Sequence, residues 1–201
     1  STFNIACGVH SNGIRIENGA QLDVEDSSFK TNGNYNNGIY ADMTTKPINI
    51  KRTDFSIDGG SYSNAIFAYK GKVTLDGETL DSTLTPDHTV TVGGTNNNGI
   101  YLPSSGTAAD KLVVKKMEFD INSPTGTEAH NNGIYVGGGR TVEEISNSIF
   151  NVNGDADTND NIALLVGDSA GKGTIAKIEN TTFNIATTNG VNGNNTKNGT
   201  A

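Results

Sequence analysis

The sequence predicts an all-β protein of the right-handed parallel β-helix class, built from about six to seven coils of three short strands each. Three observations predict this fold: a repeated Asn-Gly-Ile motif, a Phe that alternates with it, and apolar residues two positions apart between them. No segment shows a helical apolar period of useful length. Equivalent strands must then stack in register, with Ile over Ile and Phe over Phe in a shared core.

The first repeated element is Asn-Gly-Ile-Tyr or a near variant. Its copies are Asn12-Gly13-Ile14-Arg15, Asn37-Gly38-Ile39-Tyr40, Asn64-Ala65-Ile66-Phe67, Asn98-Gly99-Ile100-Tyr101 and Asn132-Gly133-Ile134-Tyr135. Degenerate copies follow at Asp160-Asn161-Ile162-Ala163 and Asn189-Gly190-Val191. Since Asn and Gly tolerate left-handed backbone, we expect each copy to begin at a turn and to continue as a strand.

The second repeated element is a Phe, replaced once by Leu, that alternates with the motif without exception. Its copies are Phe3, Phe29, Phe55, Leu80, Phe119, Phe150 and Phe183, so the basic coil has about 25 residues and later coils carry insertions. Five residues earlier stands an apolar residue: Val24, Ile50, Leu75, Val114, Ile145 and Ile178. In four coils another lies two positions before it: Leu22, Ile48, Val73 and Leu112. Alternation at period two is typical of strands with one buried face.

A bend is expected between these two strand segments, and it holds Asp26, Gly77, Asn147 and Asn180. Arg52 and Lys116 occupy the same position but do not fit its preference for left-handed residues. A β-sandwich is the alternative fold, but its strands would not repeat one tripeptide at the same phase.

The domain is expected to span residues 1–191, with insertions near 80–96, 103–110 and 123–130 and a flexible Asn/Gly/Thr tail at 192–201. Neither end resembles a dedicated cap, so we expect a segment of a longer solenoid. No run of about 18 apolar residues exists, and we expect no membrane insertion. Cys7 is the single cysteine and is expected to be a small buried hydrophobic residue.

Charge and composition narrow the classes of partner. The formal net charge is −8 and the pI is about 4.7, whereas nucleic acid binding needs a basic stripe. Only 33% of the residues are hydrophobic and 25 are Gly, which suits a solenoid because its core is a thin column. We therefore expect no nucleic acid partner.

The repeats resemble the passenger domains of bacterial autotransporters, and most closely those of the chlamydial polymorphic outer-membrane adhesins. Those adhesins repeat Phe-x-x-Asn, which is matched by Phe29 to Asn32, Phe119 to Asn122 and Phe150 to Asn153. Their Gly-Gly-Ala-Ile motif is replaced here by Asn-Gly-Ile. The resemblance implies a cell-surface, outer-membrane or secreted passenger that is often an adhesin and sometimes a toxin stalk.

The candidate binding site is the residue after Ile in each motif copy. Because that Ile and the following apolar residue are expected to point inward, Tyr40, Phe67, Tyr101 and Tyr135 are expected to form an outward ladder rising about 4.8 Å per coil. Clustered exposed aromatics are favoured at interfaces, so this stripe is expected to bind a partner. The competing explanation is that like aromatics stack for stability.

Other candidate sites are weaker. The insertions could carry binding, or they could be tolerated loops without a role. The run from Asp155 to Asp160 resembles the start of a calcium loop, but the expected Gly and distal Glu are absent, so a solvated acidic loop is the better interpretation. His10, His88 and His130 are expected to be surface loop residues that share no metal, since stacking separates His10 from His130 by roughly 19 Å.

The expected function is adhesion to a host cell-surface or matrix receptor, or self-association. A passive stalk without a ligand is the alternative. A polysaccharide-active enzyme of the pectate-lyase-like class is a third possibility, disfavoured because no pair of acids recurs with a basic partner in adjacent coils. We expect no enzyme activity, no metal and no cofactor.

Overall fold

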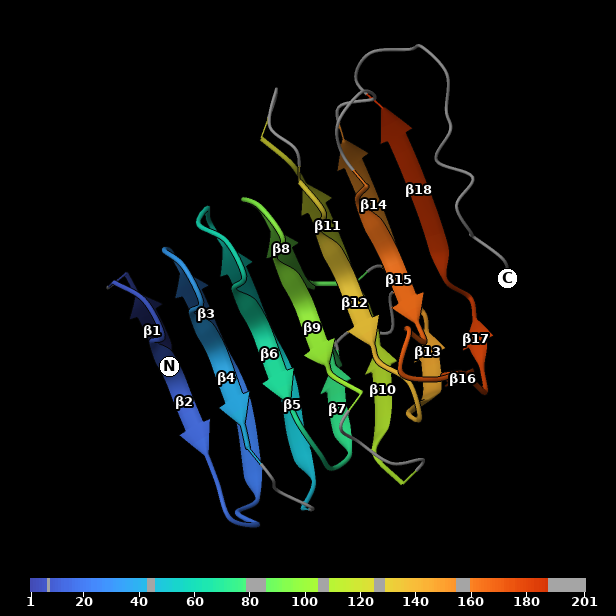
Figure 1. Ribbon diagram of the computed structural model, residues 1–201, viewed down its shortest axis with the longest axis horizontal. Coiled ribbons are helices and arrows are strands. Elements are labelled where there is room, and N and C mark those ends of the chain that lie inside the picture. Colours follow the sequence, from blue (N-terminus) through green and yellow to red (C-terminus); the bar gives the residue numbers. More distant parts are fainter. Residues whose placement is uncertain are drawn as a thin grey trace.

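The protein is a right-handed parallel β-solenoid, as the sequence predicts. The computed structural model describes residues 1–6, 8–42, 46–78, 86–104, 109–124, 129–154 and 160–187. In Figure 1 the strands of one sheet run downward in front and the others run upward behind, while the chain advances from the blue end to the red end. This sense of winding is right-handed, and the described residues contain no helix.

Two parallel sheets enclose the core. Among the described residues, the front sheet has six strands in the order β15-β12-β9-β6-β4-β2. These strands are β2 (Asn12–Ile16), β4 (Asn37–Ala41), β6 (Asn64–Ala68), β9 (Asn98–Leu102), β12 (Asn132–Val136) and β15 (Ile162–Val166). They are the predicted Asn-Gly-Ile strands, and about five turns separate the first from the last.

In the described part of the chain, the other sheet has twelve strands and is folded into two faces. Its strands are β1 (Thr2–Ile5), β3 (Leu22–Thr31), β5 (Ile48–Ile57), β7 (Val73–Asp76), β8 (His88–Val92), β10 (Lys111–Lys115), β11 (Met117–Asn122), β13 (Thr141–Ser146), β14 (Ile149–Gly154), β16 (Thr174–Ile175), β17 (Ile178–Glu179) and β18 (Thr182–Thr187). The first face contains β7, β10, β13, β16 and β17, and the second contains β1, β8, β11, β14 and β18. Strands β3 and β5 run through both faces.

The bend between the two faces lies at the predicted position. Left-handed backbone occurs there at Asp26, Asn147 and Asn180, with φ between 46° and 50°. Arg52 and Lys116, which do not fit the expected residue types, adopt it as well, with φ of 42° and 49°. Arg52 is held by its neighbour in the coil below, because its Nε donates a 2.7 Å hydrogen bond to Asp26 Oδ1.

The core consists of the predicted ladders. Val24, Ile50, Leu75, Val114, Ile145 and Ile178 are aligned in one column by parallel pairing. Phe3, Phe29 and Phe55 stack with ring centroids 4.5 and 5.0 Å apart. A second stack joins Phe119, Phe150 and Phe183 at 4.6 and 5.0 Å. Like residues therefore do meet from coil to coil.

One anchor of the Phe column was predicted wrongly. Val90 of strand β8 pairs with Phe55 below and Phe119 above, so Val90 fills the position assigned to Leu80. Leu80 itself lies outside the described residues. The insertion expected at 80–96 also ends sooner than predicted, because His88–Val92 is a strand of the core. The β-branched side chain of Val90 therefore continues the Phe column after the long insertion, in place of a Phe.

The coil count is slightly lower than the predicted six to seven. The last motif copy, at 189–191, lies outside the described residues, and so do Cys7 and the tail at 192–201. Strand β9 is followed by β10 at Lys111, and β11 is followed by β12 at Asn132. Residues 105–108 and 125–128 of the insertions predicted at 103–110 and 123–130 lie outside the described part.

Two hydrogen-bonded ladders of polar side chains run through the corner before the six-stranded sheet. In one, each amide Nδ2 donates to the Oδ1 of the Asn one coil below at 2.8 Å, through Asn12, Asn37, Asn64, Asn98 and Asn132. In the other, the side chains of Asn36, Ser63, Asn97, Asn131 and Asn161 each accept a backbone N–H from the preceding coil. The fully buried amides are thus satisfied along the axis.

These ladders also correct the register of the degenerate copy at 160–163. Asn161 continues the second ladder, and Ile162 pairs with Asn132, so Leu164 rather than Ile162 stacks on Ile134. The position after the inward Ile is therefore Leu165 and not Ala163. The predicted register was wrong by two residues because Ile162 was matched to the Ile of the motif, whereas Leu164 fills that position.

Truncating a ring inside the Phe column should be costly. We expect Phe119→Ala to lower the free energy of unfolding by about 3–5 kcal/mol, since Phe119 is fully buried between Val90 and Phe150. Urea unfolding followed by circular dichroism measures this change. Phe183→Ala is the matched control, because that ring is 40% exposed and should lose much less. Equal losses in the two variants would contradict a continuous buried column.

Candidate functional site

The predicted aromatic ladder lies on the outer side of the six-stranded sheet. Tyr40, Phe67, Tyr101 and Tyr135 are aligned by strand pairing and are each half-buried, while the residues on either side of them point into the core. Ring centroids are 4.9 Å apart for Tyr40 and Phe67, 5.3 Å for Phe67 and Tyr101, and 5.0 Å for Tyr101 and Tyr135. The structure therefore brings all four predicted residues together in one row.

The rings do not all lie parallel. Tyr40 and Phe67 are inclined by 10°, whereas the next two pairs are inclined by 45° and 48°. Tyr69 packs edge-on against Phe67 at 5.0 Å from the following corner. Tyr40 and Phe67 thus form a flat stack, whereas Tyr101 and Tyr135 present tilted ring surfaces.

Polar groups end the row on both sides. The Arg15 guanidinium lies 5.4 Å from the centroid of the Tyr40 ring and forms an ion pair with Glu17. At the other end, the Tyr135 hydroxyl donates a 3.1 Å hydrogen bond to Asp168 Oδ2, and the Ser104 hydroxyl donates to the same oxygen at 2.8 Å. A mostly apolar strip therefore lies between an ion pair at one end and a carboxylate at the other.

The surroundings of the row favour neutral phenols. Burial raises the pKa of Tyr40 and of Tyr101, and burial together with the hydrogen bond to Asp168 raises the pKa of Tyr135 to about 12. The hydrogen bond from Ser104 is the main cause that lowers the pKa of Asp168. At neutral pH the row is uncharged between Arg15 and Asp168.

A second aromatic row, which the sequence analysis missed, lies at the corner before the six-stranded sheet. His10 stacks on Tyr35 at 5.0 Å, and Tyr35 stacks on Tyr62 at 5.1 Å. Tyr35 is 43% exposed and Tyr62 is 52% exposed, so these rings reach solvent more fully than the ladder does. The signal in the sequence is their position, two residues before the Asn of successive motif copies.

The opposite corner, after the six-stranded sheet, contains a buried arginine. The Arg140 side chain is 1% exposed, and its Nε donates a 2.6 Å hydrogen bond to the Pro103 carbonyl while its Nη2 donates to the Tyr69 carbonyl. Burial lowers the pKa of Arg140, and the nearby Asp110 carboxylate opposes this. Arg140 thus ties together three successive coils at the corner where the insertion at 103–110 leaves the solenoid.

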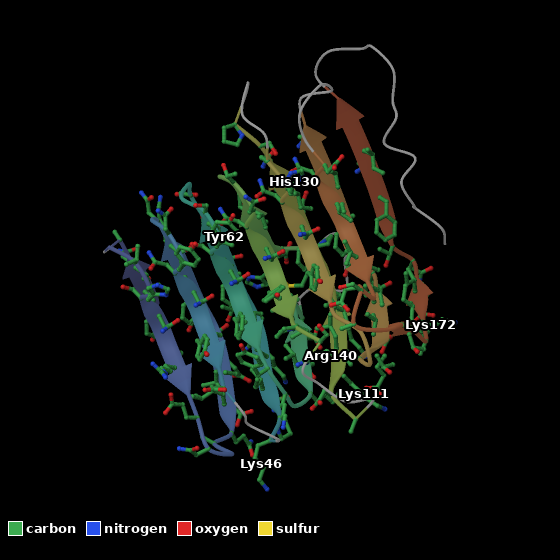
Figure 2. The ribbon with its side chains drawn as sticks, viewed as in Figure 1. Lys46, Tyr62, Lys111, His130, Arg140 and Lys172 are labelled. Atoms are coloured by element: carbon green, nitrogen blue, oxygen red, sulfur yellow. The ribbon has the colours of Figure 1, made fainter. Side chains whose placement is uncertain are left out.

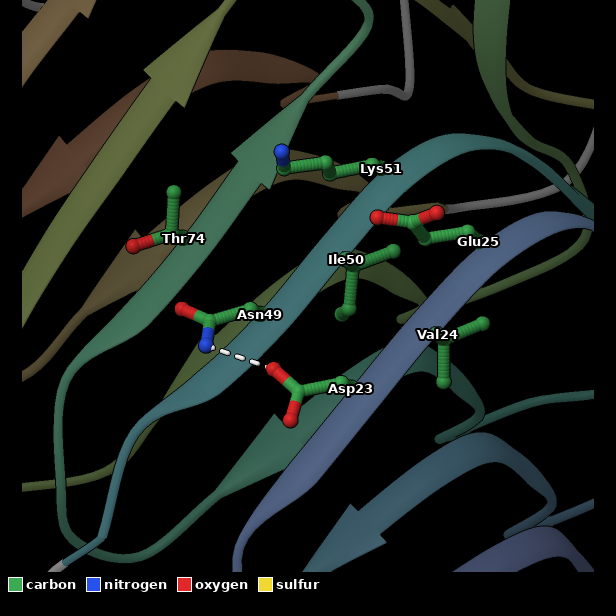
Figure 3. Close-up of a pocket in the computed structure, with 7 residues that line it drawn as sticks. All are labelled: Asp23, Val24, Glu25, Asn49, Ile50, Lys51 and Thr74. Atoms are coloured by element: carbon green, nitrogen blue, oxygen red, sulfur yellow. Dashed lines mark hydrogen bonds between the residues drawn. The ribbon is translucent and has the colours of Figure 1, made fainter.

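The first face of the twelve-stranded sheet has a shallow depression of about 290 Å³ (Figure 3). Its lining is formed by Asp23, Val24, Glu25, Asn49, Ile50, Lys51 and Thr74. Asn49 Nδ2 donates a 2.7 Å hydrogen bond to Asp23 Oδ1 and is the main cause that lowers the pKa of Asp23. Asp23 is therefore ionised at neutral pH and is not poised as a proton donor.

The histidines are dispersed. His88 begins strand β8, contrary to the loop position expected for it, and its Nδ1 lies 3.4 Å from Asp54 Oδ1. His130 Nδ1 lies 3.7 Å from Asp160 Oδ2. Among the described residues, no three His, Cys, Asp or Glu side chains are grouped to hold a metal ion. Residues 155–159 of the acidic run lie outside the described part of the chain.

The architecture places the chain in the class of parallel β-solenoid proteins with an outward aromatic ladder. No protein-family model, no curated protein and no solved structure matches it. Among the described residues there is no helix that could span a membrane. The class is therefore defined by the fold and by the rows of outward side chains.

Tyr135 provides a pH-dependent test of the row. Its pKa in the folded chain is raised to about 12, so above pH 10 the unfolded chain releases this proton first and stability falls between pH 10 and 12. We expect Tyr135→Phe to remove about 1–2 kcal/mol of that alkaline loss. Urea midpoints measured from pH 9 to pH 12 for the parent and the variant test this. Identical pH profiles would contradict the raised pKa of Tyr135.

Proposed function

We propose that this chain is a surface-exposed segment of a bacterial secreted protein that mediates adhesion to a host receptor or self-association. The observation that carries the proposal is the position of the Tyr40, Phe67, Tyr101 and Tyr135 row on the outer side of the six-stranded sheet. Aromatic side chains that are held rigidly at a surface supply large contact areas with little loss of side-chain entropy. The bacterial, cell-surface origin rests on the resemblance of the Phe-x-x-Asn repeats.

The geometry gives the row several properties of a binding strip. Strand pairing fixes its spacing, the Arg15–Glu17 ion pair and the Asp168 carboxylate place charged groups at its two ends, and the phenols between them remain neutral. An apolar centre with a polar rim is the usual arrangement of a protein interface. A partner surface with an apolar centre and complementary ends would fit it.

A passive stalk is the second candidate, and the ring contacts are the observation in its favour. Rings that lie 4.9–5.3 Å apart stabilise one another and need no ligand. Continuous Phe and Asn ladders also give the solenoid a rigid axis, which a spacer requires. The two candidates differ in whether the parent chain binds anything.

The decisive experiment measures binding of the labelled chain to host cells and to the immobilised chain. We expect Tyr40, Phe67, Tyr101 and Tyr135 changed together to Ser to lose binding by at least about tenfold, because the apolar strip disappears. Changing Lys30 and Thr91 to Ser is the control, since both lie outward on the second face. Circular dichroism establishes that each variant folds, and Tyr101→Ser alone replaces the fourfold variant if that one does not.

Each outcome has one interpretation. Binding lost by a folded ladder variant and kept by the control supports adhesion through the row. Binding kept by the ladder variant contradicts this site and moves the search to the insertions. A parent chain that binds neither cells nor itself supports the stalk.

A further inference from the structure

The second aromatic row is the most exposed apolar feature at the corner before the six-stranded sheet. His10, Tyr35 and Tyr62 stack along the solenoid axis, and the preceding Val9 is 56% exposed. In Figure 2, Tyr62 lies at the upper end of the solenoid wall, whereas Lys46 and Lys111 lie at the lower end. The row is therefore separate from the ladder on the sheet and from the lysines at the other corner.

The backbone of this row is strained. Tyr35 and Tyr62 have φ values of 57° and 58°, in the left-handed region that bulky residues avoid, whereas His10, with φ 62°, is of a residue type that is found there more often. The next coil has Asn96 in the same position with φ 56°, and Asn is a residue type that this conformation suits. Because the two tyrosine rings point to solvent, the core does not require them. Strain held at exposed side chains is typical of sites kept for binding.

The corner holds these rings firmly in place. Asn34 Oδ1 accepts hydrogen bonds from Ser61 N at 2.9 Å and from Ser61 Oγ at 3.2 Å. The Tyr35 N–H donates to the Ser61 carbonyl at 2.9 Å, and the Tyr62 N–H donates to the Thr95 carbonyl at 3.3 Å. The residue after each tyrosine is fully buried in the polar ladder. The exposed rings are thus presented by a preorganised backbone.

The chemistry of the corner is neutral. Residues 31–39, 59–67 and 93–101 contain no Asp, Glu, Lys or Arg, although charged residues are 18% of the chain. They consist mainly of Asn, Gly, Ser and Tyr, the residue types that dominate antibody binding loops. An uncharged surface on a chain of net charge −8 favours an uncharged partner over a charged one.

The surface is also periodic. Three successive coils repeat a small polar residue followed by a left-handed residue, in Asn34-Tyr35, Ser61-Tyr62 and Thr95-Asn96, at the spacing of neighbouring strands. A linear polymer whose units repeat along the axis could contact successive coils in the same way, which an irregular protein surface could not. Because the ring faces are turned toward one another, such a ligand would meet ring edges, phenol hydroxyls and amides.

From these observations we propose that the corner formed by His10, Tyr35, Tyr62 and Asn96 binds a neutral polysaccharide that runs along the solenoid axis. Hydroxyl groups of successive sugars accept and donate hydrogen bonds to the row. This site is independent of the adhesive function proposed for the ladder, which lies on different residues. Either one can fail without the other.

Affinity electrophoresis of the whole chain tests the proposal. The gels contain hydroxyethyl cellulose, dextran or mannan as neutral polymers, or polygalacturonate as an acidic one. We expect at least one neutral polymer to retard the parent, and Y35N with Y62N to weaken that binding at least about tenfold. The double variant should melt within about 4 °C of the parent, because Asn relieves the strain while the stacking is lost.

Two further variants sharpen the result. N96Y adds a third tyrosine in the same column and should tighten binding to the same polymer, which a purely structural role for the row would not produce. Tyr40→Ser alters only the ladder and should leave retardation by the polymer unchanged.

Three results overturn the proposal. The first is a parent chain that none of the neutral polymers retards. This holds even if the double variant loses binding to cells, because that loss would mean that the row binds a protein partner. The second is unchanged retardation of the folded double variant. The third is stronger retardation by polygalacturonate than by every neutral polymer.

Discussion

Stacking of equivalent residues in parallel register is the constraint on which the rest of this structure depends. Strands hydrogen-bond to their equivalents in neighbouring coils, so most side chains lie directly over a counterpart about 4.8 Å away. Strands β10 and β13 depart from this at one bulge, between Leu112 and Val113. Apolar positions then become continuous core columns, and corner amides become hydrogen-bonded ladders. Charged side chains in neighbouring coils also form ion pairs. Glu143, for example, accepts hydrogen bonds from both Lys111 and Lys72, which lower its pKa to about 2.

The same constraint shapes the surface on which function depends. An outward residue that repeats becomes a row, so a single aromatic per coil is enough to build an extended strip. Within the described residues, two such aromatic rows lie on different parts of the coil. The ladder on the six-stranded sheet is half-buried and unstrained, whereas the corner row of Tyr35 and Tyr62 is exposed and left-handed. A contribution to folding stability therefore explains the half-buried ladder more readily than it explains the exposed corner row.

Most of the fold could be predicted from the sequence because independent features of the repeat point to the same strands. The column from Val24 to Ile178 was predicted residue by residue, since alternation at period two and a fixed distance to Phe both point to it. Leu80 was wrong because an insertion broke the spacing, and the alternation in His88–Val92 is a signal that could have corrected it. The register at Asn161 was wrong because Ile162 was matched to the Ile of the motif, although Leu164 is the residue that stacks on Ile134.

The candidate site was predictable to a similar degree. The ladder of Tyr40 and its equivalents repeats inside a motif, and alternation determines that it faces outward. The row of Tyr35 and Tyr62 could not be found in this way, because His10 and Asn96 share its column without sharing its chemistry. Its exposure depends on a left-handed backbone, which the sequence suggests for Asn and Gly but not for Tyr.

The corner after the six-stranded sheet shows how a repeat fold accepts insertions near such a row. The chain leaves the solenoid after Leu102 and returns at Lys111, yet strands β7 and β10 still pair in register. Arg140 reaches the carbonyls of Pro103 and Tyr69 in the two preceding coils, and Asp110 Oδ1 accepts a 2.5 Å hydrogen bond from the Gly71 N–H. These contacts hold the two ends of the insertion to the coils beside it. Since Tyr69 packs against Phe67, they also fix the edge of the ladder, so an insertion here could change length without disturbing the spacing of the aromatic rings.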